Sequence, residues 1–343
     1  MRTIEWDEAS KSVLLIDQSI LPAEFRQIPI NTSDEMAIAI TKMVVRGAPA
    51  IGMALAANSD RSSQLEDLQK HMAQSGEYLA ASRPTAVNLQ WAIDRVMRLV
   101  TSFEGSADDL RESVLLEAHK MAEEDIATNM AISQNGAELV QDGDRIVHHC
   151  NTGALATVDY GTALGVIRMA HEQGKRVHVY VDETRPRLQG SRLTAWELSQ
   201  YGIPYEVITD STSGYLMRLK KVDRVFFGAD RVAANGDVVN KIGTYMLALA
   251  AYDNVIPAFS VFPMSTVDFD TPNGDRIQIE ERDPDEVLNM QANGQPVFPE
   301  DAKALNYAFD VTPNRLLSGL VTEKGVFYPP FFRNLLVHRD HQG

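Results

Sequence analysis

The feature that most constrains the fold is an alternation, beginning at residue 145, of short β-rich runs with segments of helical period. The runs are "RIVHHC" from 145, "RVHVYVDET" at 176–184, "PYEVITD" at 204–210, "DRVFFGAD" at 223–230 and "IPAFSVFP" at 256–263. Most are separated by segments whose apolar residues recur at helical spacing, and two of these segments end on a glycine suited to a C-cap, Gly174 and Gly202. Strands that alternate with helices are typical of βαβ units. The pattern therefore predicts an α/β fold with an open parallel sheet.

The first part of the chain has a different, mainly helical pattern. Thr32 and Glu35 in "TSDE" have the spacing of a capping box, which predicts a helix running to about residue 44. Residues 108–143 also show helical spacing of apolar positions. The sequence thus predicts two domains, a smaller and mainly helical one over residues 1–143 and an α/β domain over residues 144–343.

The formal net charge of −15 limits the partners of this protein. A surface that acidic repels nucleic acid and anionic lipid unless basic residues gather on one face, and no such cluster is evident. No window approaches the roughly 18 uninterrupted apolar residues of a membrane helix, and the opening "MRTIEWDEAS" carries charges where a signal peptide has an apolar run. One cysteine excludes an internal disulfide, which fits a reducing compartment. We expect a cytoplasmic protein that binds neither nucleic acid nor membrane.

Polar clusters follow the predicted strands at their C-terminal ends: "HCNTG", "DETRP", "TDSTSG" and "GADR". In open α/β sheets, ligands bind outside the carboxyl ends of the strands. We therefore expect one crevice to be lined by Cys150, Asp182, Arg185, Asp210 and Asp230.

Cys150 is the only cysteine of the chain. A lone cysteine most often packs as a small apolar residue, but this one is placed at a strand end, beside a loop that precedes a helix. A helix N-terminus favours the thiolate, which can serve as nucleophile or base. Alternation along a strand puts His148, and not His149, on the side of Cys150. We expect both histidines to pack or to support the site rather than to catalyse.

Asp230 follows the apolar run "VFF" and precedes Arg231. One reading is a loop-capping aspartate. The other is a carboxylate desolvated by its apolar neighbours, which favours the protonated form and suits a general acid. A thiol and a carboxyl in one crevice point to proton transfer. We expect no metal and no cofactor, because the chain has no "HExxH" or CxxC pattern, no evident cluster of histidines with carboxylates, and no dinucleotide or P-loop motif.

Three groups of residues are suited to a phosphate. Arg46 in "RGAPAIG" stands beside backbone N–H groups at a predicted helix start, and Arg83 in "SRPTAVN" also precedes one. Asn240 and Lys241 lie together in "GDVVNKIGTY", near the predicted beginning of the helix after "GADR". In so acidic a chain, these groups indicate an anionic ligand.

Eight motifs, in order along nearly the whole chain, resemble the methylthioribose-1-phosphate isomerase family of methionine salvage. They are "VRGAPAIG", "SRPTAVNL", "EEDIATNMAI", "HCNTGALAT", "DETRPRLQGSRLTAWEL", "GADRVAANGDVVNKIGTY", "IEERDP" and "AFDVTP". The resemblance implies a smaller N-terminal domain joined to a Rossmann-like C-terminal domain, usually in a homodimer. It also implies conversion of 5-methylthioribose 1-phosphate, a sugar phosphate, to 5-methylthioribulose 1-phosphate without a metal.

The same resemblance implies roles for particular residues. The catalytic pair falls on Cys150 and Asp230. The substrate contacts fall on Arg46, Gly47, Ala48, Arg83, Gln189, Asn240 and Lys241. Gln189 comes from the resemblance alone, whereas the residue patterns themselves point to most of the others.

Two stretches depart from the family pattern, "DSTSGYLM" at 210–217 and Tyr307 in "LNYAFDVTP". The first leaves open an action on 5-deoxyribose 1-phosphate. An isomerase of ribose 1,5-bisphosphate is a second alternative, and a non-catalytic relative of the regulatory subunits of translation initiation factor 2B is a third. The retained thiol and carboxyl favour an enzyme.

Overall fold

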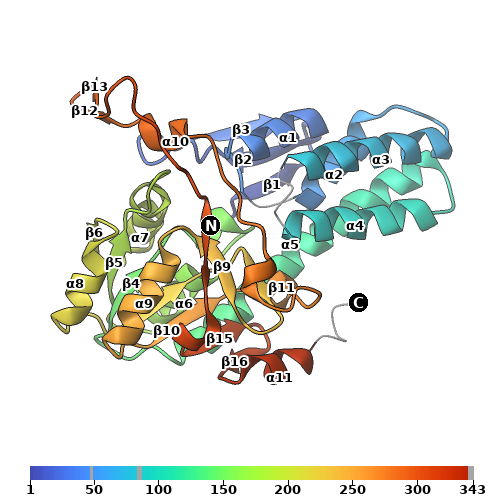
Figure 1. Cartoon of the computed structure of the whole chain (residues 1–343). Helices are drawn as coiled ribbons and strands as arrows, with labels where there is room; N and C mark the ends of the chain where they lie inside the picture. The colour runs from blue at the N-terminus through green and yellow to red at the C-terminus, as the bar shows by residue number, and fades with distance from the viewer. Residues whose placement is uncertain (47–48, 83–86, 339–343) are drawn as a thin grey trace. The chain divides into compact units, whose positions relative to one another are not determined.

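The computed structural model describes residues 1–46, 49–82 and 87–338 (Figure 1). The chain divides into two compact units: Met1–Met130 with Gly153–Gly161, and Ala131–Thr152 with the residues from Thr162 onward. Each unit has its own buried apolar side chains. The domain division predicted between residues 143 and 144 stays a prediction.

The first unit combines an antiparallel sheet with a group of helices. Among the described residues, its strands in spatial order are β1 (Ile4–Asp7), β2 (Ser12–Ile16) and β3 (Gln27–Ile30). Its helices are α1 (Ser33–Thr41), α2 (Pro49–Ser59), α3 (Leu65–Ala81), α4 (Val87–Ser102) and most of α5 (Ala107–Ala137). Helices and sheet share one apolar core, which includes side chains of β1, β2 and all five helices.

The predicted N-cap at the start of α1 is confirmed, but the reciprocal bond of the capping box is displaced by one residue. Thr32 Oγ1 accepts a hydrogen bond from Glu35 N at 3.1 Å, whereas Glu35 Oε2 accepts from the N–H of Asn31, the residue before the N-cap, at 2.8 Å. The helix ends at Thr41, a turn earlier than predicted, because Met43 adopts a left-handed φ of 57°.

The second unit is built on a parallel sheet, as the sequence predicts. In the part of the chain that the structure describes, the strand order is β16-β15-β10-β7-β4-β5-β6. All neighbours are parallel except the antiparallel pair β15 and β16. The strands are β4 (Arg145–His148), β5 (His178–Asp182), β6 (Tyr205–Ile208), β7 (Arg224–Phe227), β10 (Ala258–Val261), β15 (Gly319–Thr322) and β16 (Gly325–Phe327).

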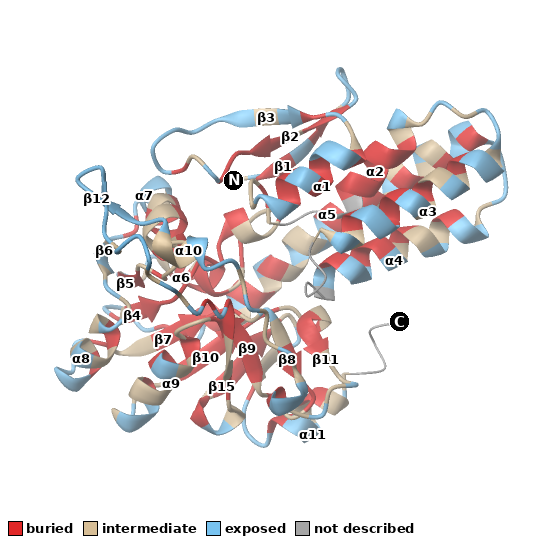
Figure 2. Cartoon of the chain, turned by 45° about the horizontal axis from the view of Figure 1, so that its top comes forward, coloured by how far each residue is buried: buried red, intermediate tan, exposed pale blue. Residues whose placement is uncertain are grey.

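Helices cover both faces of this sheet. Phe226 of β7 packs in one apolar core with side chains of α6 (Ala163–Glu172) and α7 (Ala195–Tyr201). Its neighbour Phe227 packs in a second core with side chains of α8 (Thr212–Arg218) and α9 (Thr244–Asp253). Successive residues of a strand point to opposite faces, so the central strands are buried on both sides (Figure 2). The α/β fold is confirmed.

A smaller sheet corrects one prediction. Its order over the described residues is β11 (Val267–Asp268), β8 (Arg231–Ala233), β9 (Val238–Lys241) and β14 (Phe309–Thr312). Asn240 and Lys241 therefore end a strand and do not begin a helix. Both edges of β9 are paired, and Gly243, with a left-handed φ of 102°, separates it from α9.

The remaining elements are short. They are α10 (Asp285–Leu288), the hairpin of β12 (Gln291–Ala292) and β13 (Gln295–Pro296), and α11 (Phe331–Leu336). None of the helices in the described residues has the length and apolar character needed to cross a membrane.

Candidate active site

The loops that leave β4, β5 and β6 are joined by hydrogen bonds at the carboxyl ends of these adjacent parallel strands. Cys150 N donates to Thr184 Oγ1 at 2.9 Å. Thr184 N and Arg185 N donate to the two carboxylate oxygens of Asp210, at 2.7 and 2.8 Å. The structure thus brings Cys150, Arg185 and Asp210 to one edge of the sheet, as expected from the strand ends.

Cys150 lies in a turn just beyond β4. Its φ of 65° is left-handed, a conformation that non-glycine residues rarely adopt, and only 7% of its surface is exposed. Thr184 holds its N–H, and Thr194 Oγ1 donates to its carbonyl oxygen at 2.7 Å. Because β4 ends at His148, strand alternation does not extend to Cys150, and the predicted sharing of a face with that histidine stays a prediction.

As expected, Cys150 is followed by a loop and then by a helix. The loop includes a three-residue 3₁₀ turn, Ala154–Ala156, and α6 begins at Ala163. The first turn of α6 is bonded to the same loop, because Leu164 N donates to Thr152 Oγ1 at 2.9 Å. The turn around Cys150 is therefore held mainly by threonine hydroxyls.

His148 is a packing residue. It is fully buried, with Nδ1 3.0 Å from the carbonyl oxygen of Phe226 and Nε2 3.3 Å from Thr152 Oγ1. Burial lowers the pKa of His148 to about 3. The ring is neutral at physiological pH, donates to Phe226 and accepts from Thr152.

His149 makes a buried ion pair with Asp182 at the end of β5. Nδ1 is 2.9 Å from Asp182 Oδ2, and Nε2 is 2.9 Å from the carbonyl oxygen of Ile242. Burial by itself lowers the pKa of His149, but the hydrogen bond and charge of Asp182, with the charge of Asp210, outweigh it and raise the pKa. Because both ring nitrogens face acceptors, we assign an imidazolium. The side chain of Asp182 is thus buried in this network and does not line an open crevice as predicted.

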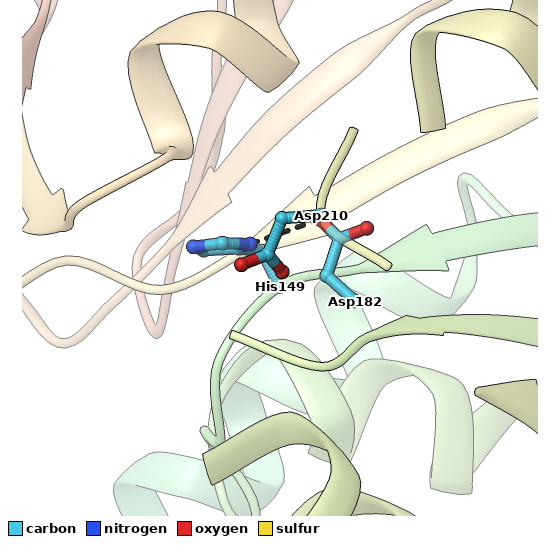
Figure 3. A group of neighbouring side chains, drawn as sticks. All are labelled: His149, Asp182 and Asp210. Carbon is cyan, nitrogen blue, oxygen red and sulfur yellow. Dashed lines mark hydrogen bonds and ion pairs between the residues drawn. The ribbon is translucent and has the colours of Figure 1, made fainter. Parts of the chain in front are cut away.

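His149, Asp182 and Asp210 also have the composition of a metal site (Figure 3). One ligand atom from each lies within 4.8 Å of the others. However, these atoms already have partners: Ile242 and Asp182 for the histidine, the histidine and Ser213 Oγ for Asp182, and two backbone N–H groups for Asp210. The cluster fits a hydrogen-bonded network better than a cation site.

Asp230 follows β7 and directly precedes β8, with its backbone N–H donating to the carbonyl oxygen of Val239 at 2.8 Å. The residue is exposed. The predicted desolvation by the preceding apolar residues is therefore wrong: Phe226 and Phe227 are fully buried, but the chain leaves the sheet through Gly228 before it reaches the carboxylate.

Lys241 is buried in the same unit, with 6% of its surface exposed. Its Nζ lies 4.4 Å from the centre of the Phe309 ring. Burial lowers the pKa of Lys241, whereas the electrostatic interactions of Lys241 with Cys150 and Asp230 act in the opposite direction. The ammonium is thus within electrostatic reach of both predicted catalytic groups. The neighbouring Asn240 is also buried, and its Nδ2 donates to Thr244 Oγ1 at 3.0 Å.

Gln189 precedes a π-helical turn, Gly190–Thr194, that packs on the end of β5. A Cβ on Gly190 would lie 1.7 Å from the carbonyl oxygen of Asp182, so only glycine fits there. Gln189 is 4% exposed, and its buried Oε1 has no hydrogen-bond partner among the described residues. A buried acceptor without a donor is the feature that a hydroxyl-bearing ligand would satisfy.

Four predicted substrate contacts belong to the first unit. Arg46 is partly buried, and its Nε donates to Gln18 Oε1 at 3.0 Å. Gln18 in turn donates through Nε2 to the carbonyl oxygen of Leu155 at 2.7 Å. Gly47, Ala48 and Arg83 lie outside the described residues.

Several residues of this edge were missed in the sequence. Thr184 and Thr194 hold the Cys150 turn, and Asp310 accepts from Gly243 N and Tyr245 N at 2.8 and 3.0 Å at the start of α9. Burial raises the pKa of Asp310 to about 6. Thr184 is part of "DETRP", in which the neighbouring charged residues are the stronger signal of a functional site.

Fold and site together define an α/β protein with a thiol, an ammonium and carboxylates at the ends of its strands. The model of the Initiation factor 2 subunit family matches residues 41–329, and the chain belongs to that family.

Two relatives cover nearly the whole chain. One, "Methylthioribose-1-phosphate isomerase 2" of Pseudothermotoga lettingae, is 50% identical over 97% of both chains. The other is the crystal structure of 5-methylthioribose 1-phosphate isomerase from Pyrococcus horikoshii, with a TM-score of 0.92 and 42% identity over 99% of this chain and 96% of that one. A second solved structure, described as translation initiation factor eIF-2B, subunit delta, from A. fulgidus, has a TM-score of 0.86 and 41% identity over 98% of this chain and 99% of that one.

Proposed function

We propose that this protein is an aldose–ketose isomerase that converts 5-methylthioribose 1-phosphate to 5-methylthioribulose 1-phosphate in methionine salvage. The observation that carries the proposal is the whole-length similarity to proteins of that name, at 50% identity over 97% of the chain. The local geometry supports it, because Cys150, Lys241 and Asp230 lie within electrostatic reach at the end of the sheet.

The substrate sets the first chemical task. Its anomeric oxygen is esterified with phosphate, so the ring cannot open to a free aldehyde without help. We propose that Asp230 protonates the ring oxygen as the C1–O bond breaks, which leaves a hydroxyl on C4. The resulting carboxylate then removes the proton of the C2 hydroxyl as the C2 carbonyl forms. Asp230 thus ends the cycle protonated, as it began.

The second task is to move hydrogen from C2 to C1. In one route, the Cys150 thiolate removes the C2 proton, an enol forms between C1 and C2, and the thiol returns the proton to C1. In the other, hydride passes from C2 to C1 and Cys150 stabilises the transition state. Both routes conserve atoms and electrons, and neither needs a metal or a redox cofactor.

Substrate binding is assigned to seven residues, three of which are cationic. We propose that the phosphate and hydroxyl groups are held by Arg46, Gly47, Ala48, Arg83, Gln189, Asn240 and Lys241. The buried and unpartnered Oε1 of Gln189 supports a hydroxyl contact, and the buried ammonium of Lys241 supports an anionic one. In this assignment, Arg46, Gly47, Ala48 and Arg83 are the phosphate contacts that the domain at 1–143 contributes.

The A. fulgidus structure favours a second candidate function, because a chain described as a translation factor subunit is 41% identical to this one. A regulatory protein of that kind would bind a sugar phosphate or nucleotide without turning it over. It would have no use for a thiol and carboxyl at the strand ends, and therefore ranks second.

We also propose a cytoplasmic homodimer. Apolar side chains of the adjacent helices α8 and α9 are exposed in the single chain, with Tyr215 at 62%, Met246 at 64% and Tyr252 at 60%. Light scattering during gel filtration tests this assignment, and a monomer at micromolar concentration would contradict it.

Proton NMR of the purified protein with 5-methylthioribose 1-phosphate tests the function. We expect the ketose product, with weaker turnover of 5-deoxyribose 1-phosphate and none of ribose 1,5-bisphosphate. Saturable binding without turnover would instead support the regulatory candidate. In D2O, deuterium at C1 of the product would exclude a pure hydride shift.

A further inference from the structure

His149 lies where three segments that are distant in sequence meet. It follows β4, its Nδ1 bonds to Asp182 at the end of β5, and its Nε2 bonds to the carbonyl oxygen of Ile242 between β9 and α9. Only 1% of its surface is exposed. The ring also packs against Gly243, where a Cβ would lie 2.9 Å from Cε1.

These contacts connect the turn that carries Cys150 with the segment that carries Lys241. Cys150 is the next residue after His149, and Lys241 is the residue before Ile242. A shift of the imidazole would therefore move the cysteine turn, the lysine or both. The neighbouring His148 has no such position, because its contacts are Phe226 within the sheet and Thr152.

The acceptors around His149 require both ring protons. A carbonyl oxygen can only accept, so Nε2 carries hydrogen. Asp182 accepts from Ser213 Oγ through Oδ1, and its Oδ2 is 2.9 Å from Nδ1. Burial raises the pKa of Asp182, whereas the hydrogen bond and charge of His149 lower it. We place the shared proton on the ring, because Asp210 adds a second negative charge beside it. With Asp182 ionised, a neutral ring would leave one of its two bonds unmade in a buried site, which is unfavourable.

The charges that face the ring act together to keep it protonated. Asp182 on β5, Asp210 after β6 and Asp310 on β14 are acidic, while His148 on its own strand stays neutral and Lys241 on β9 is the nearby cation. Three carboxylates against one ammonium favour the imidazolium.

We propose that His149, held by Asp182 and bound to the Ile242 carbonyl, is a positioning residue that fixes the Cys150 turn relative to Lys241. The expected effect of this role on kcat rests on the proposed isomerase function, whereas its effect on the structure of the Cys150 turn does not. His149 itself does not touch the substrate. Its loss loosens the turn and the lysine together.

The ring can be observed directly by 15N NMR of histidine-labelled protein, with the His149 signals assigned by their loss in His149→Gln. We expect both nitrogens to be protonated at pH 7 and to remain so well above the ordinary histidine range. A neutral His149 ring at pH 7 would overturn the proposal whatever the enzyme does.

The single cysteine allows a readout that needs no substrate. Alkylation of Cys150 by iodoacetamide rises with pH to a plateau where the thiol is fully ionised, and the plateau rate then reports access alone. We expect a faster plateau in His149→Gln than in the wild type. His148→Gln is the matched comparison, since it removes an equally buried neighbouring ring that bonds to Phe226 and Thr152 but not to Asp182 or Ile242, and it should change the plateau and kcat less than His149→Gln does.

Kinetics separate positioning from general stability. A displacement of about 1 Å in a catalytic group can reduce turnover by on the order of 10²-fold, so we expect His149→Gln to lower kcat by about that factor, with a smaller change in KM. In Asp182→Asn the ring keeps an acceptor but loses its counter-charge. The kcat of Asp182→Asn should therefore fall as pH rises through neutrality, because the ring then loses a proton. The pH profile of the wild type should show no such fall. This second variant, with NMR of the wild type, keeps the test decisive if His149→Gln does not fold.

The two hypotheses fail in different ways. A wild-type protein without isomerase turnover refutes the proposed function, and the NMR and alkylation results then judge the positioning role alone. A folded His149→Gln with wild-type kcat and an unchanged alkylation plateau refutes the positioning role alone.

Discussion

The Cys150 turn depends on the hydroxyl of Thr184, which makes Thr184→Val a quantitative test. This fully buried hydroxyl accepts from Cys150 N and donates to the carbonyl oxygen of Asp182, both at 2.9 Å. The left-handed backbone of Cys150, at φ 65°, costs a non-glycine residue about 1–2 kcal/mol. Each hydrogen bond contributes about 1 kcal/mol, and each buried partner left unsatisfied costs about 1–3 kcal/mol. Valine has the same shape but makes neither bond.

We therefore expect Thr184→Val to lower the free energy of unfolding by about 2–4 kcal/mol. The strain of the turn is then no longer offset, and kcat should fall by about tenfold or more as Cys150 leaves its position. Urea denaturation measures the first quantity, and steady-state kinetics on the folded fraction measure the second.

Thr312→Val is the matched control for this variant. Thr312 is also fully buried, in β14, but its Oγ1 has no hydrogen-bond partner among the described residues. Burying an unpaired hydroxyl is unfavourable, so its removal should raise the free energy of unfolding by about 1 kcal/mol. Equal destabilisation by both valines, or a wild-type kcat in Thr184→Val, would refute the reasoning about the turn.

Three further predictions concern charge. Burial raises the pKa of Asp125 to about 6 in the folded protein, above its unfolded value of 3.8. The contribution of the protonated carboxyl to stability is therefore fully present below pH 3.8 and is lost as the pH rises through about 6. Asp125→Asn should raise the free energy of unfolding above pH 6 by up to about 3 kcal/mol, as measured by urea denaturation across pH. Phe309→Leu removes the ring that lies 4.4 Å from Lys241 Nζ. This variant should lose about 1–2 kcal/mol of substrate-binding free energy, which raises KM about tenfold. Because the ligand atoms of His149, Asp182 and Asp210 already have hydrogen-bond partners, EDTA should change neither kcat nor the melting temperature.

Each of these three predictions can be contradicted by a specific result. Asparagine at 125 can still accept from Val158 N, at 2.9 Å in the wild type, so an unchanged pH dependence would show that ionisation of Asp125 is not the cause. A lower kcat with unchanged KM in Phe309→Leu would mean that Lys241 acts in the chemical step rather than in binding. Inactivation by EDTA that zinc or magnesium reverses would reinstate the metal reading.

The strands of the parallel sheet were predictable because their signals are local. Apolar β-rich runs such as 223–230 alternate with helical periods, and Gly202 does cap α7 in the left-handed conformation, with φ 67°. The run "VVNKIG" was assigned wrongly, since its few apolar residues suit a strand as well as a helix start. The pairing of β9 with both β8 and β14, which decides between them, is a long-range property.

The features of the candidate site also divide into local ones, which the sequence predicted, and long-range ones, which it did not. Cys150 and Asp230 could be predicted because both follow the ends of strands. The exposure of their side chains could not be predicted, and Asp230 is exposed where burial was expected. The left-handed turn at Cys150 carries no local signature, because it is imposed by threonines 34 and 44 residues away. The ion pair of His149 joins residues 33 apart and gives no local sequence signal.

We propose that Cys150 and Asp230 carry out the chemistry of a sugar-phosphate isomerase. The most direct test follows 5-methylthioribose 1-phosphate by proton NMR with the wild type, Cys150→Ser and Asp230→Asn, each shown to be folded by circular dichroism. We expect the wild type to form the ketose and both variants to lose turnover by several orders of magnitude. Turnover that survives Cys150→Ser would mean that the cysteine only packs, and would refute its proposed chemical role.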